Sequence, residues 1–235
     1  MQLTKELYSA LVKNGKAVIA ITGGGGKTTL LRKLSTYLKK QSLSVLITTT
    51  TKIQNPLFYD YEADCIFKDE LGILTHEVEK GEKVFYAESS KYDIKKTVSP
   101  RLELLSVLKD RYDVLLYEAD GSRGLPLKIH SERDPVIIDG TTAVIAVMGL
   151  SAIGEKAYSV VFGDDSDKIV DSEYITSYLR DPDGLTKGMK AYTDNVIVVN
   201  QCDGHEDKID EVMKVRFPYP VFIASEENDE VYLSV

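Results

Sequence analysis

The 235-residue chain is poor in cysteine and has no long apolar stretch. Its two cysteines, Cys65 and Cys202, are too few for a disulfide framework or a zinc knuckle. The longest apolar stretch, residues 143–150, is less than half of the roughly 20 residues that span a bilayer. The first ten residues lack a basic segment followed by an apolar core. We therefore expect no membrane span, no secretory signal and a reducing, cytoplasmic setting.

Positive charge and histidine are also scarce. The 29 Lys and Arg residues against 37 Asp and Glu give a net charge of −8, which disfavours broad binding to nucleic acid or to an anionic membrane. A local basic pocket for a small anion is still compatible with this balance. Of the three histidines, His76 and His205 lie in polar stretches and carry no signal, and His130 lacks the paired His or Cys spacing of a zinc site. We expect His130 to be a hydrogen-bonded residue.

Short apolar runs do occur, and they predict strands. The six runs are residues 17–21, 45–47, 114–117, 143–148, 196–199 and, more weakly, 221–223. They do not alternate apolar with polar residues, so each strand is expected to be covered on both faces, as in a parallel sheet.

The segments between these runs predict helices. In residues 28–40 the leucines fall on one stripe with Lys and Arg opposite, and in residues 99–110 Ser99 is the expected N-cap before Pro100. Further helices are expected at residues 3–12, 171–179 and 207–215. Alternating strands and helices predict an α/β fold, a mostly parallel sheet with helices on both faces. We expect a single domain over residues 1–235, with a helical insertion or lid around residues 151–188.

A run of four glycines follows the first predicted strand. The sequence continues with Lys27, Thr28 and Thr29 and then with the amphipathic helix, which argues against a flexible linker. Glycines let backbone N–H groups turn into one concavity, and the start of a helix adds its own free donors and its positive dipole end. Lys27 adds a full charge, and the Thr28 hydroxyl suits Mg²⁺. The segment predicts a P-loop for the phosphates of a nucleotide, formed by Thr22, Gly23, Gly24, Gly25, Gly26, Lys27, Thr28 and Thr29.

The loop departs from the usual P-loop pattern at one position. The pattern G-x-x-x-x-G-K-[ST] places a glycine at position 21, where this chain has Ile21. The loop is similar to that of Mur-type ligases, and to that of MinD/ArsA-like proteins, which carry a signature lysine where this chain has Thr22. Both likenesses imply Mg²⁺–nucleotide binding, and they differ in how hydrolysis is triggered.

Four threonines and a lysine end the second predicted strand. Thr48 and Thr49 are compatible equally with strand propensity and with a ligand contact. We expect Thr50, Thr51 and Lys52 to contact substrate phosphate or metal-bound water.

Acidic residues end the third predicted strand. Glu118 takes the position of the strand-end acid that holds Mg²⁺ in P-loop proteins, and Asp120 follows on the same side. Ser122, Arg123 and Lys128 come next and are expected to bind anionic groups of a substrate. The predicted metal ligands are Thr28, Glu118 and Asp120, and the predicted catalytic residues are Lys27, Glu118, Asp120 and Arg123.

A later strand ends in Asn200-Gln-Cys-Asp203, similar to the Asn-Lys-x-Asp base-reading motif of GTPases. Asp203 would then accept hydrogen bonds from guanine, which adenine cannot supply. The alternative is an ordinary turn, which Asn and Asp favour. The sequence thus predicts Mg²⁺ with ATP or GTP and does not choose between them.

Five segments together resemble the YqeC family, described as accessory proteins of selenium-dependent hydroxylases. They are residues 21–29, 48–53, 118–128, 135–136 and 147–154. The resemblance implies a P-loop NTPase-like three-layer sandwich, a nucleotide site at residues 23–29 and a functional cluster at Glu118, Asp120, Ser122, Arg123 and Lys128. It also implies a protein partner in the maturation of molybdenum hydroxylases.

Three hypotheses for the function follow. The first is a weak Mg²⁺-dependent NTPase acting in that maturation. The second is a nucleotide-gated module that binds a partner with negligible turnover. The third is a Mur-ligase-like ATP-binding domain, for which 235 residues leave little room beside the nucleotide site. The sequence does not reveal the oligomeric state.

Overall fold

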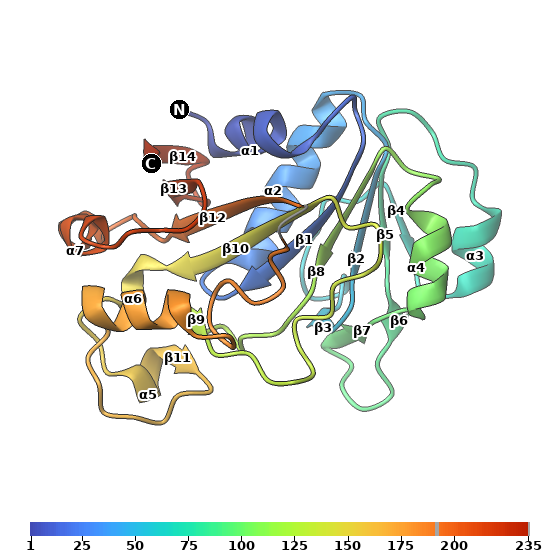
Figure 1. The fold of residues 1–235 in the computed structure, drawn as a ribbon. Helices are drawn as coiled ribbons and strands as arrows, with labels where there is room; N and C mark the ends of the chain where they lie inside the picture. The colour runs from blue at the N-terminus through green and yellow to red at the C-terminus, as the bar shows by residue number, and fades with distance from the viewer. Residues whose placement is uncertain (191–192, 235) are drawn as a thin grey trace.

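The computed structural model describes residues 1–190 and 193–234 and is centred on a nine-stranded sheet (Figure 1). The strand order is β14-β13-β12-β10-β1-β8-β2-β5-β4. These strands are β1 (Ala17–Gly23), β2 (Val45–Thr49), β4 (Cys65–Phe67), β5 (Lys83–Tyr86), β8 (Val114–Glu118), β10 (Ala143–Gly149), β12 (Asp194–Asn200), β13 (Val221–Ser225) and β14 (Glu230–Ser234). All neighbours are parallel except β13 and β14. The predicted mostly parallel α/β fold is confirmed.

Each of the six predicted strands is present and runs further at its carboxyl end than the apolar run that predicted it. Every residue of β1, β2, β8 and β10 is buried, as expected for strands covered on both faces. β1 lies at the centre, pairing with β10 on one side and with β8 on the other, so that Ile21 is in register with Ile145 and with Glu118. The acidic strand end is therefore placed directly beside the glycine loop.

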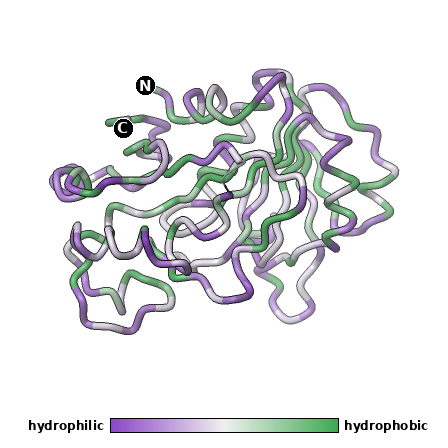
Figure 2. Tube along the Cα trace, viewed as in Figure 1, coloured by the Kyte–Doolittle hydropathy of each residue, from purple (hydrophilic) through white to green (hydrophobic). Residues whose placement is uncertain are grey.

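Helices cover both faces of the sheet. The helices are α1 (Leu3–Leu11), α2 (Lys27–Lys40), α3 (Glu70–Thr75), α4 (Leu102–Leu108), α5 (Ala157–Val160), α6 (Ser172–Arg180) and α7 (Ile209–Met213), with the 3₁₀ turns η1 (Leu150–Ala152) and η2 (Glu206–Lys208). α1 and α2 pack on the face that carries Ile19 and Ile21. On the opposite face α4 packs beside Val18 and Ala20, while α6 and α7 pack beside β10 and β12. Figure 2 shows apolar residues along the central strands and polar residues in the outer loops.

Two predicted helices differ from the structure. α4 begins at Leu102 with Arg101 as N-cap, and Ser99 is not the cap because its hydroxyl donates to the Pro100 carbonyl at 2.6 Å while the chain stays extended through Arg101. The helix expected at residues 207–215 is divided into η2 and α7 and ends at Met213.

Residues 151–188 contain α5 and α6 but also irregular backbone and a strand. This strand, β11 (Val161–Phe162), pairs with β9 (Leu127–Lys128). Buried side chains of the segment, such as Val161 and Ile175, share one apolar cluster with β10 and β12.

A separate three-stranded sheet consists of β3 (Lys52–Gln54), β7 (Lys96–Val98) and β6 (Glu88–Ser89). Within the described residues, no helix has the length and apolarity to cross a membrane.

Candidate functional site

The glycine loop joins the carboxyl end of β1 to the start of α2, at the edge of the sheet where the parallel strands end (Figure 1). Its first amides are bound by the protein itself: Gly23 N–H donates to Asp120 Oδ2 (2.8 Å), Gly24 N–H to the Val147 carbonyl (2.8 Å) and Gly25 N–H to the Leu125 carbonyl (3.1 Å). The first N–H groups of a helix have no intrahelical partner. The donors available to a ligand are therefore the amides around Gly26–Thr29, in the second half of the predicted loop.

Only glycine fits at the start of this loop. Gly23 has φ 92°, and a Cβ there would lie 2.1 Å from the Val147 carbonyl oxygen. Gly25 has φ 76°, and its Cβ would lie 2.6 Å from the Gly149 nitrogen. Both conformations are costly for other residues, and both contacts are with backbone that cannot move aside. The loop is thus packed directly on β10.

Lys27 is held at the base of the loop. Its ammonium donates to the Gly23 carbonyl at 2.5 Å and lies 3.1 Å from Asp120 Oδ1. The Lys27 and Asp120 side chains are 5% and 0% exposed. A buried charge requires an opposite charge or several hydrogen bonds, and this pair supplies both.

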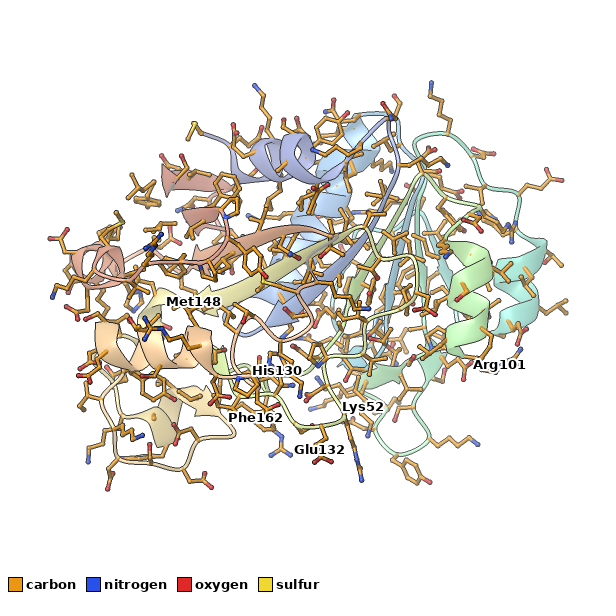
Figure 3. The ribbon with its side chains drawn as sticks, viewed as in Figure 1. Lys52, Arg101, His130, Glu132, Met148 and Phe162 are labelled. Carbon is orange, nitrogen blue, oxygen red and sulfur yellow. The ribbon has the colours of Figure 1, made fainter. Side chains whose placement is uncertain are left out.

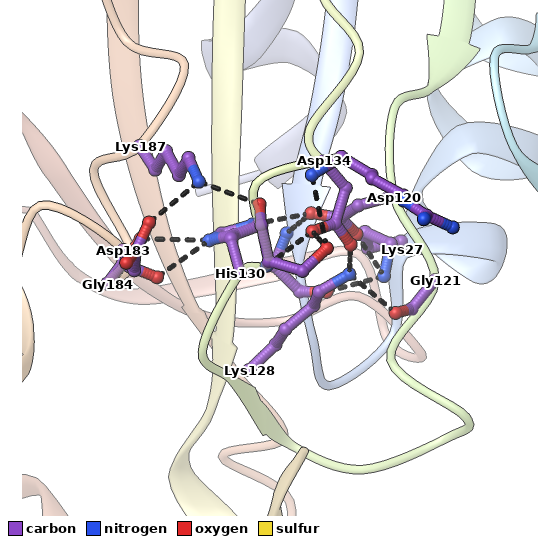
Figure 4. A network of polar contacts seen from close by, with 12 residues as sticks. Lys27, Asp120, Gly121, Lys128, His130, Asp134, Asp183, Gly184 and Lys187 are labelled. Carbon is purple, nitrogen blue, oxygen red and sulfur yellow. Dashed lines mark hydrogen bonds and ion pairs between the residues drawn. The ribbon is translucent and has the colours of Figure 1, made fainter. Parts of the chain in front are cut away.

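Asp120 is the centre of a buried polar network (Figure 4). His130 Nε2 lies 2.7 Å from Asp120 Oδ2, and His130 Nδ1 lies 3.0 Å from the Gly184 carbonyl. Burial acts to raise the pKa of Asp120, but Lys27 and His130 outweigh it and hold that pKa down at about 2. His130 therefore joins the loop, through Asp120, to the backbone that follows α6, and this fits the expectation of a hydrogen-bonded histidine.

Glu118 faces the first turn of α2. The Thr28 hydroxyl donates to Glu118 Oε1 at 2.5 Å. Burial raises the pKa of Glu118, with the nearby Lys27 charge acting in the opposite direction. A buried carboxylate and a hydroxyl in contact are the hard oxygen donors that Mg²⁺ prefers.

A cleft of about 680 Å³ opens in front of the loop. Three cationic side chains line it besides Lys27, namely Lys52, Lys96 and Arg123. The Arg123 guanidinium lies 5.1 Å from the centre of the Phe162 ring, a cation–π distance, so β11 helps to position it. Figure 3 shows Lys52 and Phe162 on the same side of the molecule as His130, with Arg101 far from them beside α4.

The structure places the other predicted substrate residues differently. Ser122 lines the cleft with Arg123. Thr50 and Thr51 are not among its lining residues, and the Thr50 hydroxyl donates to the Val136 carbonyl at 2.8 Å. The Lys128 ammonium is buried, donates to the Gly121 carbonyl at 2.7 Å and pairs with Asp134. Lys128 thus stabilises the loop after β8 through these two contacts, and its ammonium does not face the cleft.

Asn200 and Asp203, predicted as base-reading residues, lie near the loop in different ways. The buried Asn200 amide donates to the Gly25 carbonyl at 2.6 Å and accepts from the Glu226 N–H at 2.8 Å. Asp203 accepts a hydrogen bond from the Asn228 side chain and is not among the residues lining the cleft. Asn200 therefore supports the loop, and no contact of Asp203 with the cleft is present among the described residues.

The sequence alone assigned no role in this site to Glu226, Lys96 or His130. Glu226, after β13, lines the cleft so closely that a Cβ on Gly26 would lie 2.3 Å from its Oε1. Burial raises the pKa of Glu226 to about 7. Lys96 comes from β7, and His130 stands alone in the sequence. Only a weak clue existed, the position of Glu226 directly after the last predicted parallel strand.

Comparison with known proteins places the chain in a family. The model of the family described as "YqeC protein" matches residues 19–163, which include most of β1, the glycine loop and the acidic strand end. A protein of Escherichia coli (strain K12), described as "Uncharacterized protein YqeC", is 31% identical over 204 residues, which are 82% of this chain and 78% of that protein. The chain therefore belongs to the YqeC family.

Proposed function

We propose that this chain is a Mg²⁺-dependent P-loop protein that binds a nucleoside triphosphate and hydrolyses it slowly. One observation carries the proposal. A buried strand, a glycine loop that accepts no side chains and a helix start with Lys27 and Thr28 meet the Glu118 carboxylate at one edge of the sheet. Amides at a helix start, an ammonium and an oxygen pair are the chemistry that recognises a polyphosphate with its metal.

Mg²⁺ fits the donor set at Thr28 and Glu118. Both groups offer oxygen and they already touch. Burial raises the pKa of Glu118, so a cation beside it would favour its charged form. When bound, Mg²⁺ would supply charge neutralisation for the phosphates. Asp120 suits this role less, because the Gly23 N–H and His130 both bind its Oδ2, and the Lys27 ammonium lies 3.1 Å from its Oδ1. We assign Asp120 to positioning Lys27.

The remaining residues of the cleft suit an anionic ligand. Lys27 and the free amides would hold the phosphates, while Arg123, Lys52 and Lys96 add positive charge around the cleft. In a chain of net charge −8 this local concentration of cations favours a strongly anionic ligand. The biological role that we propose, support for the maturation of selenium-dependent molybdenum hydroxylases, comes from the family resemblance.

Calorimetric titration with Mg²⁺–ATP, Mg²⁺–GTP and their non-hydrolysable analogues tests the binding. Lys27→Ala removes a hydrogen bond from a charged group, worth about 1.5–3 kcal/mol, so the affinity should fall by about ten- to 150-fold. Lys16→Ala is the matched control, because the Lys16 ammonium pairs with Asp113 and is 62% exposed. Equal affinity of wild type and Lys27→Ala would remove the proposal. The same titrations decide between ATP and GTP.

A nucleotide-gated partner-binding module is the second candidate. It is favoured by the contact of Gly25 with Gly149, the residue that leads into η1 and residues 151–188. Phosphate release by purified protein separates the two candidates. Release above background that is lost in Lys27→Ala supports the NTPase. Tight binding without release, together with a molybdenum hydroxylase captured only in the presence of nucleotide, supports the module.

A further inference from the structure

Three metal-ligating side chains meet far from the nucleotide cleft. Cys65 begins β4, His76 follows α3, and Glu82 precedes β5. One ligand atom from each lies within 4.8 Å of the other two. Because β4 and β5 run parallel to β1, this cluster lies at the amino ends of the strands, on the edge of the sheet opposite the glycine loop.

The distances within this cluster approach those of a metal site. His76 Nε2 lies 2.9 Å and 3.0 Å from the two oxygens of Glu82, and Cys65 Sγ lies 3.3 Å from Glu82 Oε1. Around a tetrahedral zinc ion with ordinary bond lengths, neighbouring ligand atoms are about 3.4–3.6 Å apart. Small outward movements of the three side chains would thus open a position for one ion.

The surroundings hold the three ligands in place. The Glu79 N–H donates to Glu82 Oε2 at 3.1 Å, and the Arg111 guanidinium donates to the carbonyls of Ile73, Leu74 and His76. The side chains of His76 and Glu82 are 17% and 11% exposed, so solvent reaches the cluster and can supply a fourth ligand. The Arg111 guanidinium thus binds backbone carbonyls of this segment.

The chemistry of the ligand atoms also favours zinc. On binding Zn²⁺ the Cys65 thiol would release its proton, because the thiolate is the form of cysteine that ligates a metal. Thiolate, imidazole and carboxylate together are a ligand set of zinc, whereas Mg²⁺ and Ca²⁺ prefer oxygen alone.

We propose that Cys65, His76 and Glu82 bind one Zn²⁺, with water as the fourth ligand, and that the ion fastens the start of β4 to the segment between α3 and β5. β4 is the last strand of the sheet and has only three residues. Zn²⁺ coordination that joins β4 to the segment before β5 would stabilise this short edge strand, which pairs only with β5 within the described residues. The site is independent of the nucleotide cleft.

Metal titration of the untagged full-length chain tests the proposal. After treatment with a chelator, Zn²⁺ is titrated in competition with a chromophoric chelator, and Co²⁺ is used as a spectroscopic probe. We expect one equivalent of either ion, a thiolate-to-cobalt charge-transfer band and a higher melting temperature with Zn²⁺. Cys65→Ser should abolish the band, and Glu82→Gln should weaken Zn²⁺ binding by roughly 100-fold, since loss of even an outer partner weakens it ten- to 100-fold.

Matched controls separate this site from the rest of the chain. Cys202→Ser should keep the band, because Cys202 is buried elsewhere and donates to the Val199 carbonyl. Lys27→Ala should keep Zn²⁺ binding while it loses nucleotide, so the two proposals fail separately. If Cys65→Ser does not fold, His76→Gln gives the affinity instead. Less than one tenth of an equivalent of Zn²⁺, or a band that survives Cys65→Ser, would overturn the site.

Discussion

The ion pairs at the two ends of the central strands differ in how far they are exposed to solvent. At the carboxyl edge, where the glycine loop lies, the ion pair of Lys27 and Asp120 is 5% and 0% exposed. At the amino edge, the ion pair of Lys16 and Asp113 has a similar distance, 3.1 Å, but is 62% and 31% exposed. Exposed pairs contribute little to stability, and buried pairs can cost more in desolvation than they return. The difference teaches that the carboxyl edge keeps a buried charge pair at a desolvation cost that the amino edge avoids.

The largest effect should follow from removing one buried charge. Asp120→Asn leaves Lys27 buried without its carboxylate and should lower the free energy of unfolding by about 3–5 kcal/mol. Urea unfolding followed by circular dichroism measures this loss. Asp113→Asn, the same change at the amino edge, should cost clearly less. Equal losses for the two variants would show that the edges do not differ.

Glu226 at the carboxyl edge and Glu82 at the amino edge should change the free energy of unfolding in opposite directions as the pH rises. Burial raises the pKa of Glu226 to about 7, so its contribution is present below its ordinary pKa of 4.5 and is lost as the pH rises through 7. Glu226→Gln should therefore gain about 2–3 kcal/mol relative to wild type between pH 5 and 8. Urea unfolding at several pH values gives the curve.

Glu82 provides the contrast at the amino edge. Burial acts to raise the pKa of Glu82, but the hydrogen bond from His76 holds it below its ordinary value. Its contribution is therefore present above pH 4.5 and is lost as the pH falls below that value. Glu82→Gln measured without added metal should lose stability relative to wild type near neutral pH, the reverse of Glu226→Gln. The same sign for both variants would contradict the comparison.

A different effect should follow from removing the side chain that supports the glycine loop. Asn200→Ala leaves the Gly25 carbonyl and the Glu226 N–H without their partner, at about 1–3 kcal/mol for each buried group. Nucleotide affinity should fall equally for ATP and GTP, because Asn200 contacts backbone. Calorimetry with both nucleotides checks this, and a loss confined to GTP would return Asn200 to the base-reading role.

The smallest effect should come from the amino edge. Lys16→Ala removes the exposed ion pair with Asp113 and a hydrogen bond to the Tyr112 carbonyl at 3.1 Å. The expected loss of unfolding free energy is about 0–1 kcal/mol, and it should shrink further at high salt. Thermal unfolding at two salt concentrations measures it.

The fold was largely predictable because its signals are local. Apolar runs without alternation identified the six central strands, and the leucine stripe identified α2. Short elements such as β3, β6 and β7 gave no comparable signal, since two or three residues cannot establish a periodicity. Ser99 was wrong as a cap because its hydroxyl had a nearer acceptor.

The candidate site was predictable only in part, for the same reason. Gly23–Thr29 and Glu118 stand in patterns that carry their own chemistry. Glu226, by contrast, reaches the loop across 200 residues of sequence, and His130 becomes significant only when the fold brings Asp120 and the Gly184 carbonyl to it. The partners of Cys65 were likewise hidden, because a strand, a helix end and a turn bring them together.

The close packing of three backbone segments has a mechanical consequence. A Cβ on Gly25 would strike Gly149, and a Cβ on Gly149 would strike the Gln201 side chain, whose Oε1 accepts from Ser151 at 2.6 Å. At the first contact backbone meets backbone, so a displacement of Gly25 towards β10 would require Gly149 to move as well. The connection from Gly149 to Ser151 runs through the Gln201 side chain, which is therefore the adjustable part of this chain of contacts.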